Sequence, residues 1–175
     1  MSYLTTKEKE TIEKAVERIK LDTGLSYPEN GLLDIVDSLG VKVSSAALPP
    51  FEGKKVKGFI KWLSDEEKEG NHYIAKIYLN SDQSETTKTF TLAHELGHFL
   101  LHKETNNFRI DLQDYSEEGD PKNEETEANY FAGALLMPAD KLSIALKNAK
   151  NMQDVAKSFG VSVPAVEARM KWLRR

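Results

Sequence analysis

The 175-residue sequence contains no cysteine, which excludes disulfide bonds, thiolate metal ligands and cysteine nucleophiles. It also lacks an apolar run of the roughly 20 residues that a membrane-spanning helix needs. Its first residues contain no apolar stretch of the kind found in signal peptides. Neither sign of charge is in large excess, because 28 acidic residues oppose 24 basic ones. We therefore expect a cytoplasmic protein without membrane contacts and without a general affinity for nucleic acid.

The first half of the chain combines helical and strand-like patterns. Apolar residues recur at helical spacing over residues 6–22 and 30–39. Strand-forming residues follow over 41–43, 58–63 and 72–79. A polar stretch around Gly70 separates the last two, which predicts an antiparallel hairpin. Because an extended substrate commonly pairs with an edge strand beside a peptidase cleft, we expect the strand near 74–79 to help form such a cleft.

The second half of the chain is mainly helical, apart from one acidic segment. Residues 104–127 contain nine acidic and two basic residues, and we expect 104–122 to form an exposed loop that could cover a cleft. Helices are predicted at about 87–102, 123–137, 139–149, 151–159 and 163–173. Together the patterns predict an α+β fold with a small, mostly antiparallel sheet.

One predicted helix carries the pattern His94-Glu95-Leu96-Gly97-His98. Residues four apart on a helix share a face, with Cβ atoms about 5–6 Å apart, so both imidazoles can bind one zinc ion. Glu95 projects beside that face without being a ligand. It can take a proton from a metal-activated water and pass it to the leaving amine. The motif thus indicates a metallopeptidase with Glu95 as catalytic base; zinc is the expected metal, with manganese as the alternative.

A catalytic zinc site needs a third protein ligand. The helix expected to begin near residue 123 has three carboxylates in its first turn: Glu124, Glu125 and Glu127. Glu125 lies three residues before Ala128, on the side of the helix expected to be buried, so it is the favoured ligand. Glu127 is its rival. Glu124 is the weakest of the three.

Other polar residues near these motifs have expected supporting roles. His102 follows His98 by one turn, but two turns from His94 span about 12 Å, so one ion cannot be reached from both ends of the helix. We expect His102 to be a neighbour of the site. Asn129 lies one turn after Glu125 and can hold a ligand histidine through its second ring nitrogen. Tyr130 and His72 are candidates for stabilising the oxyanion.

Three segments together resemble the ImmA/IrrE family of metallopeptidases. They are the strand ending IYLN, then FTLAHELGHFLLH, then ETEANYFAGALLMP, and they span roughly residues 56–138. In this resemblance His94 and His98 match the zinc-binding histidines, and Glu95 matches the catalytic glutamate. The pattern Glu-x-x-Ala-Asn from Glu125 resembles the Glu-x-x-Ala-Asp third-ligand motif of gluzincin peptidases, with Asn129 in the place of the aspartate.

The resemblance implies a fold, a substrate and a regulatory role. It implies a zincin-like peptidase domain over residues 1–140 and a substrate that is a helix-turn-helix transcriptional repressor. Cleavage of such a repressor would relieve repression of phage, mobile-element or stress-response genes. The alternative is a non-hydrolytic regulator that binds a repressor or DNA through its C-terminal helices. The intact Glu95 favours the enzyme, because a purely structural metal site does not need that base.

The C-terminal segment, residues 141–175, resembles a helix-turn-helix. Gly160 marks the turn, and Ser162 can cap the second helix. Residues 150–175 have a net charge of +4. However, the second helix begins Val163-Pro164-Ala165-Val166 and has no Arg, Asn or Gln early enough to read base edges. The sequence therefore argues against direct, specific DNA binding and favours packing on the peptidase domain or recognition of the repressor.

Overall fold

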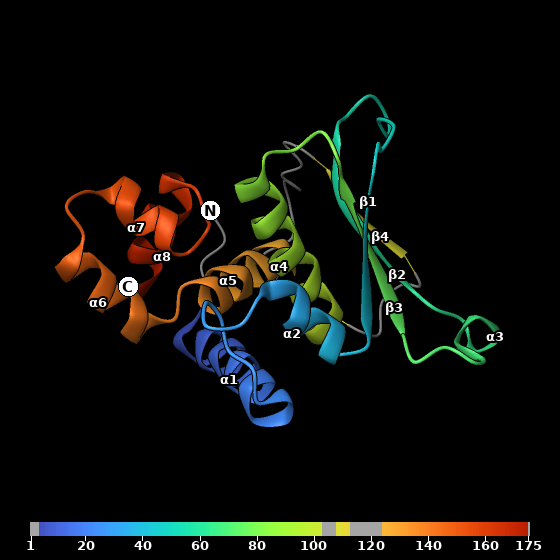
Figure 1. Ribbon diagram of the computed structural model, residues 1–175, viewed down its shortest axis with the longest axis horizontal. Coiled ribbons are helices and arrows are strands. Elements are labelled where there is room, and N and C mark those ends of the chain that lie inside the picture. Colours follow the sequence, from blue (N-terminus) through green and yellow to red (C-terminus); the bar gives the residue numbers. More distant parts are fainter. Residues whose placement is uncertain (1–3, 103–107, 113–123, 175) are drawn as a thin grey trace.

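The structure, a computed structural model, describes residues 4–102, 108–112 and 124–174 of a mixed α+β chain. Each helix and strand expected from the sequence is present (Figure 1). The helices are α1 (Thr6–Thr23), α2 (Leu32–Ser38), α3 (Asp65–Lys68), α4 (Glu85–Leu101), α5 (Glu124–Leu136), α6 (Ala139–Asn148), α7 (Met152–Ser158) and α8 (Val163–Leu173). The strands are β1 (Val41–Ala46), β2 (Val56–Trp62), β3 (Ala75–Asn80) and β4 (Phe108–Leu112).

The four strands form one sheet in the order β1-β3-β2-β4. The predicted hairpin is confirmed, because β2 and β3 pair antiparallel, with the short helix α3 in their connection. β1 pairs parallel with β3, and β4 pairs antiparallel with β2. The expectation that β3 borders a cleft as an edge strand is wrong, because both of its sides are already hydrogen-bonded to neighbouring strands. The edges of the described sheet are β1 and β4.

The acidic segment contains a strand that the sequence analysis missed. β4 lies within residues 104–122, which were expected to form a loop. Its sequence, Phe-Arg-Ile-Asp-Leu, alternates apolar and charged residues, as a strand with two unlike faces does. The rest of the predicted loop lies outside the described residues.

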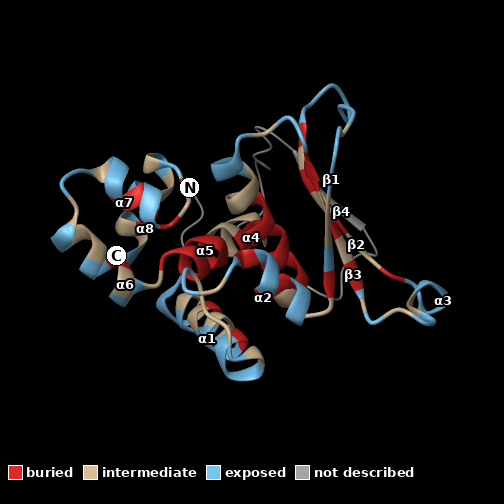
Figure 2. Ribbon diagram, in the orientation of Figure 1, coloured by how far each residue is buried: buried red, intermediate tan, exposed pale blue. Residues whose placement is uncertain are grey.

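The helix α4 packs on one face of the sheet, against β2 and β3. Gly58 of β2 makes this approach possible. A Cβ atom at Gly58 would lie 2.8 Å from Cγ2 of Thr91 on α4 and 2.9 Å from the carbonyl oxygen of Tyr78. Buried residues are concentrated on α4, on α5 and on the strands next to them (Figure 2). The middle of α4 is therefore enclosed between the sheet and α5.

The contact between α4 and α5 depends on Gly97. A Cβ atom there would lie 3.0 Å from Cδ1 of Phe131 and 3.2 Å from Cα of Ala128, both on α5. Glycine is costly within a helix, and this close packing is a physical reason for its presence in α4. As a result, the two helices that carry the candidate site residues lie close to each other.

The C-terminal helices continue from α5, and α8 packs against α5. Gly133 of α5 leaves room for Trp172, whose ring would lie 3.1 Å from a Cβ atom at that position. Arg169 is fully buried and donates to Glu13 Oε1 at 2.8 Å and to the Met137 carbonyl at 3.2 Å. These contacts join α8 to α1 and to the end of α5. The division at residue 140 into two units stays a prediction.

Among the described residues, every helix is too short or too polar to cross a lipid bilayer.

We expect Gly97→Ala to lower the free energy of unfolding by roughly 1–3 kcal/mol, the usual cost of overpacking a core. The added methyl group would press on the backbone of Ala128, which cannot move aside like a flexible side chain. Urea unfolding followed by circular dichroism measures this change. Alanine is the better helix former by about 1 kcal/mol, so a variant as stable as the wild type, or more stable, would contradict the proposed packing role.

Candidate metal centre

The helix α4 presents two buried histidines toward the same point. Ser84 caps this helix by accepting a hydrogen bond from the Thr87 backbone amide. His94 and His98 lie one turn apart, and their Nε2 atoms are 3.0 Å from each other. Both side chains are buried. The helical spacing seen in the sequence thus brings the two imidazoles together.

The helix α5 brings Glu125 to this pair. Its Oε2 lies 3.2 Å from His94 Nε2, and its Oε1 lies 3.3 Å from His98 Nε2. Ligand atoms at about 2.0–2.2 Å from one tetrahedral zinc ion are roughly 3.3 Å apart. Among the described residues, these three form a group whose donor atoms lie within 4.8 Å of one another. Two imidazoles and one carboxylate at these separations therefore fit a divalent metal such as zinc.

The contacts around Glu125 also shift its ionisation. Burial on its own would raise the pKa of this carboxyl group. The contacts with His94 and His98 outweigh burial and hold the pKa well below its ordinary value. Glu125 is consequently a carboxylate at neutral pH, the form that binds a metal ion.

Glu127, the rival candidate, faces a different partner. Its Oε2 lies 2.8 Å from His102 Nε2, and His102 Nδ1 lies 3.0 Å from His98 Nδ1. The structure thus brings Glu125, and not Glu127, to the Nε2 atoms of His94 and His98. His102 is a neighbour of the pair, as the helix geometry predicted.

The Nδ1 atoms of His94 and His98 both have hydrogen-bond partners, and these partners indicate the tautomer of each ring. A carboxylate only accepts hydrogen bonds, and a neutral imidazole has one donor and one acceptor nitrogen, so a His102 that donates from Nε2 to Glu127 accepts at Nδ1. His98 then donates from Nδ1, which leaves its Nε2 lone pair directed at the site. On the other side, His94 Nδ1 donates to Asn129 Oδ1 at 3.0 Å. Both Nε2 atoms are therefore able to bind a metal.

Glu95 lies between the two histidines in sequence and is fully buried. It does not belong to the group of donor atoms that could hold the ion. The role of Glu95 as catalytic base stays a prediction.

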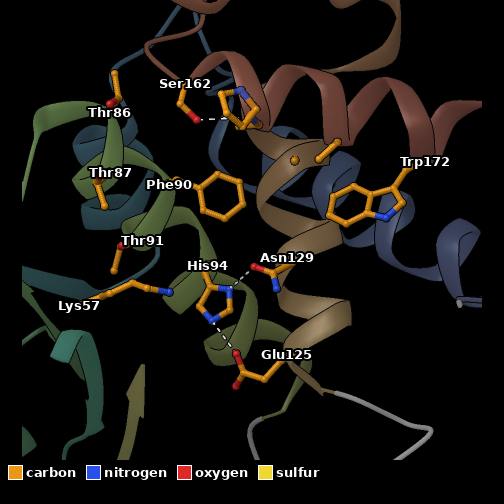
Figure 3. Close-up of a pocket in the computed structure, with 14 residues that line it drawn as sticks. Lys57, Thr86, Thr87, Phe90, Thr91, His94, Glu125, Asn129, Ser162 and Trp172 are labelled. Carbon is orange, nitrogen blue, oxygen red and sulfur yellow. Dashed lines mark hydrogen bonds and ion pairs between the residues drawn. The ribbon is translucent and has the colours of Figure 1, made fainter. Parts of the chain in front are cut away.

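A cavity of about 530 Å³ opens beside His94 and Glu125 (Figure 3). Its walls come from α4, α5, α8 and one residue of β2. The two residues considered for the oxyanion do not line it. The Tyr130 hydroxyl donates to Glu13 Oε1 at 3.0 Å, and the His72 ring packs on Tyr73.

The β2 residue in this cavity is Lys57, which the sequence analysis missed. Its Nζ points toward His94 (Figure 3). The pairing of β2 with β4 shifts at this point, since Val56 pairs with Leu112 and Gly58 with the adjacent Asp111. Such bulges change the direction of a side chain and are common near active sites. Lys57 adds a positive charge that can attract a carbonyl or carboxylate oxygen of a ligand.

A buried asparagine holds the strand at this bulge. Asn80, at the end of β3, donates from Nδ2 to the Val56 carbonyl at 2.8 Å, and its Oδ1 accepts from the Asp82 amide at 3.2 Å. Asn80 is the last residue of the IYLN segment. The sequence alone does not connect Asn80 with Lys57, because the hydrogen bond from Asn80 to the neighbouring Val56 carbonyl exists only after the sheet has formed.

Comparison with solved structures supports the fold. A chain described as a Mycobacterium tuberculosis transcriptional regulator has a TM-score of 0.58 and 19% sequence identity. The match covers 98% of this chain and 48% of the other, so this chain spans about half of that protein's length. No curated protein matches this chain.

Comparison with family models gives the relationship directly. The family described as peptidase M78, IrrE N-terminal-like domain, matches residues 36–171, which is well over half of the sequence. This range contains α4 and α5 with the candidate metal ligands, and it also contains most of α8. The resemblance noted from the sequence motifs is thereby confirmed, and the chain belongs to the M78 peptidase family of IrrE N-terminal-like domains.

Proposed function

We propose that this protein is a zinc-dependent endopeptidase in which His94, His98 and Glu125 hold the metal and Glu95 is the catalytic base. The observation that carries the proposal is the convergence of two Nε2 atoms and one carboxylate within 4.8 Å, at the side of a cavity. Membership of a peptidase family supports it. Manganese is the alternative metal, because the same donor atoms suit both ions.

The metal site, Glu95 and Asn129 have separate roles in the proposed hydrolysis of a peptide bond. When bound, zinc polarises the scissile carbonyl and lowers the pKa of a water molecule. Glu95 accepts a proton from the attacking water and delivers it to the nitrogen of the leaving amine. The burial of Glu95 keeps that proton away from bulk solvent between the two transfers. Asn129 orients His94 on the side facing α5.

We further propose that the substrate is a helix-turn-helix transcriptional repressor and that cleavage takes place in the cytoplasm. The family resemblance supports this substrate class. The structural neighbour from Mycobacterium tuberculosis is named a transcriptional regulator, which agrees with a role in gene control. The gene adjacent to this one is the first place to look for the repressor, and the purified pair can be tested with and without zinc.

Glu95→Gln is expected to abolish cleavage of this repressor while zinc still binds. The amide cannot accept and return the proton, but it is close to the carboxylate in size, so the buried site keeps its shape. Gel electrophoresis measures cleavage, and competition with a chromophoric chelator measures zinc affinity. The control is wild-type protein stripped of metal, which should be inactive and regain activity when zinc is added. Normal cutting by Glu95→Gln would show that the proposed mechanism is wrong.

The hydrogen-bonded series Glu127, His102 and His98 leads to a second expectation. Glu127→Ala should weaken zinc binding by about 10- to 100-fold, the usual effect of removing a group that orients a metal ligand. Without the carboxylate, His102 is free to reverse its tautomer, and His98 loses its fixed acceptor. Chelator competition measures the affinity, and thermal unfolding of the metal-free protein tests whether the fold itself has changed.

Two matched variants distinguish the orienting effect of Glu127 on His102 from the effect of its negative charge. Glu127→Gln retains an oxygen that accepts from His102 Nε2, so it should recover most of the zinc affinity. Glu124→Ala removes the same charge from the same turn of α5 and should bind zinc nearly as the wild type does. Equal losses in Glu124→Ala and Glu127→Ala would mean that charge at the helix end matters and that the orienting role is wrong.

A further inference from the structure

The C-terminal helix α8 forms one wall of the cavity beside His94. Among its cavity-lining residues, Ala165, Ala168 and Trp172 recur at intervals of three and four, so they share one face of the helix. Val166 and Arg169, each one position further along, are fully buried against the rest of the protein. The helix thus has one face in the core and an adjoining face on the cavity.

The position of this wall is held by specific contacts. Arg169 bonds to Glu13 of α1 and to the Met137 carbonyl after α5. Lys9 of α1 also donates to the Trp172 carbonyl at 3.1 Å. Trp172 lies over Gly133, where any larger residue would push it away. The wall is therefore a fixed part of the cavity.

The two ends of the cavity differ in chemistry. Next to α8 its lining includes the rings of Phe90 of α4 and Trp172 (Figure 3). Ala165 and Ala168 of α8 also line it and have small apolar side chains. At the other end are His94, Glu125 and Lys57. The volume of about 530 Å³ is within the range of about 300–1,000 Å³ that is usual for ligand pockets. A ligand that fits has a large apolar group a short distance from a polar, reactive one.

We propose that α8 is a substrate-recognition wall, which receives a large apolar side chain of the substrate next to the scissile bond. This inference rests on the proposed peptidase function and adds a specificity to it. It also gives the C-terminal helices a role other than DNA binding. The first turn of a DNA-reading helix enters the major groove, whereas Ser162, Pro164 and Ala165 at the start of α8 line the cavity.

The test is to fill the cavity from α8 with Ala168→Phe. Ala168 is exposed to the cavity, so the added ring occupies the space without disturbing the core. The matched control is Lys171→Phe, which adds the same ring at an exposed position outside the cavity lining. Each zinc-loaded protein digests the same mixture of random-sequence peptides, and mass spectrometry identifies the residues that flank each cut.

For the wild type and Lys171→Phe, we expect large apolar residues to be preferred over small ones at one flanking position by about tenfold or more. Ala168→Phe should lose this preference and cut beside small residues, with unchanged zinc affinity. If Ala168→Phe keeps the wild-type preference, or if the wild type has no preference for large apolar residues, the proposed wall is wrong.

A binding measurement separates this proposal from the proposed enzymatic function. The chain has two tryptophans, so Trp62→Phe leaves Trp172 as the fluorescent reporter in the cavity. If neither these peptides nor the repressor is cut although zinc is bound, the peptidase proposal fails. In that case, saturable binding of N-acetyl-phenylalaninamide, seen by Trp172 fluorescence and lost when Ala168→Phe is added, would still support the wall. No change in fluorescence would overturn it.

Discussion

The close packing of α4 on α5 at Gly97 is the constraint on which the rest of the site depends. The two histidines are separated by one helical turn, so α4 alone fixes their spacing. Their distance to Glu125 depends on how near α5 lies. With the Cβ position of Gly97 only 3.2 Å from Cα of Ala128, the helices approach almost as closely as their backbones allow. Because Glu125 precedes Ala128 by one turn, this contact brings its carboxylate to about 3.2–3.3 Å from both imidazoles.

The packing of α4 on α5 also brings together negative charge that a bound metal ion would neutralise. Glu95 and Glu125 place two carboxyl groups close to the buried side chains of His94 and His98. Burying charge is costly unless it is compensated. A divalent cation has the charge that balances two carboxylates, and the hydrogen bonds to Asn129 and His102 leave both Nε2 lone pairs directed toward it. The helix packing, the histidine tautomers and the local charge therefore all favour a divalent metal ion.

The sequence predicted those parts of the site that follow from regular helix geometry. His94 and His98 could be selected as candidate ligands from their spacing of four, with Glu95 beside them as the candidate base. The choice between Glu125 and Glu127 was harder, because both precede Ala128 and only the rotation of α5 against α4 separates them. β4 was missed because its short alternating pattern lies in an acidic segment. Lys57 was missed because its direction depends on a bulge that forms only when β2 pairs with β4.

The ion pair between the buried Arg169 and the partly exposed Glu13 determines what the C-terminal helices can do. Loss of Glu13 would leave the guanidinium of Arg169 buried without its charged partner, which is costly. If α8 swung away to enter a DNA groove, both groups would have to separate, and Trp172 would have to leave its place over Gly133. A helix held in this way is better suited to shaping a cavity than to moving between partners.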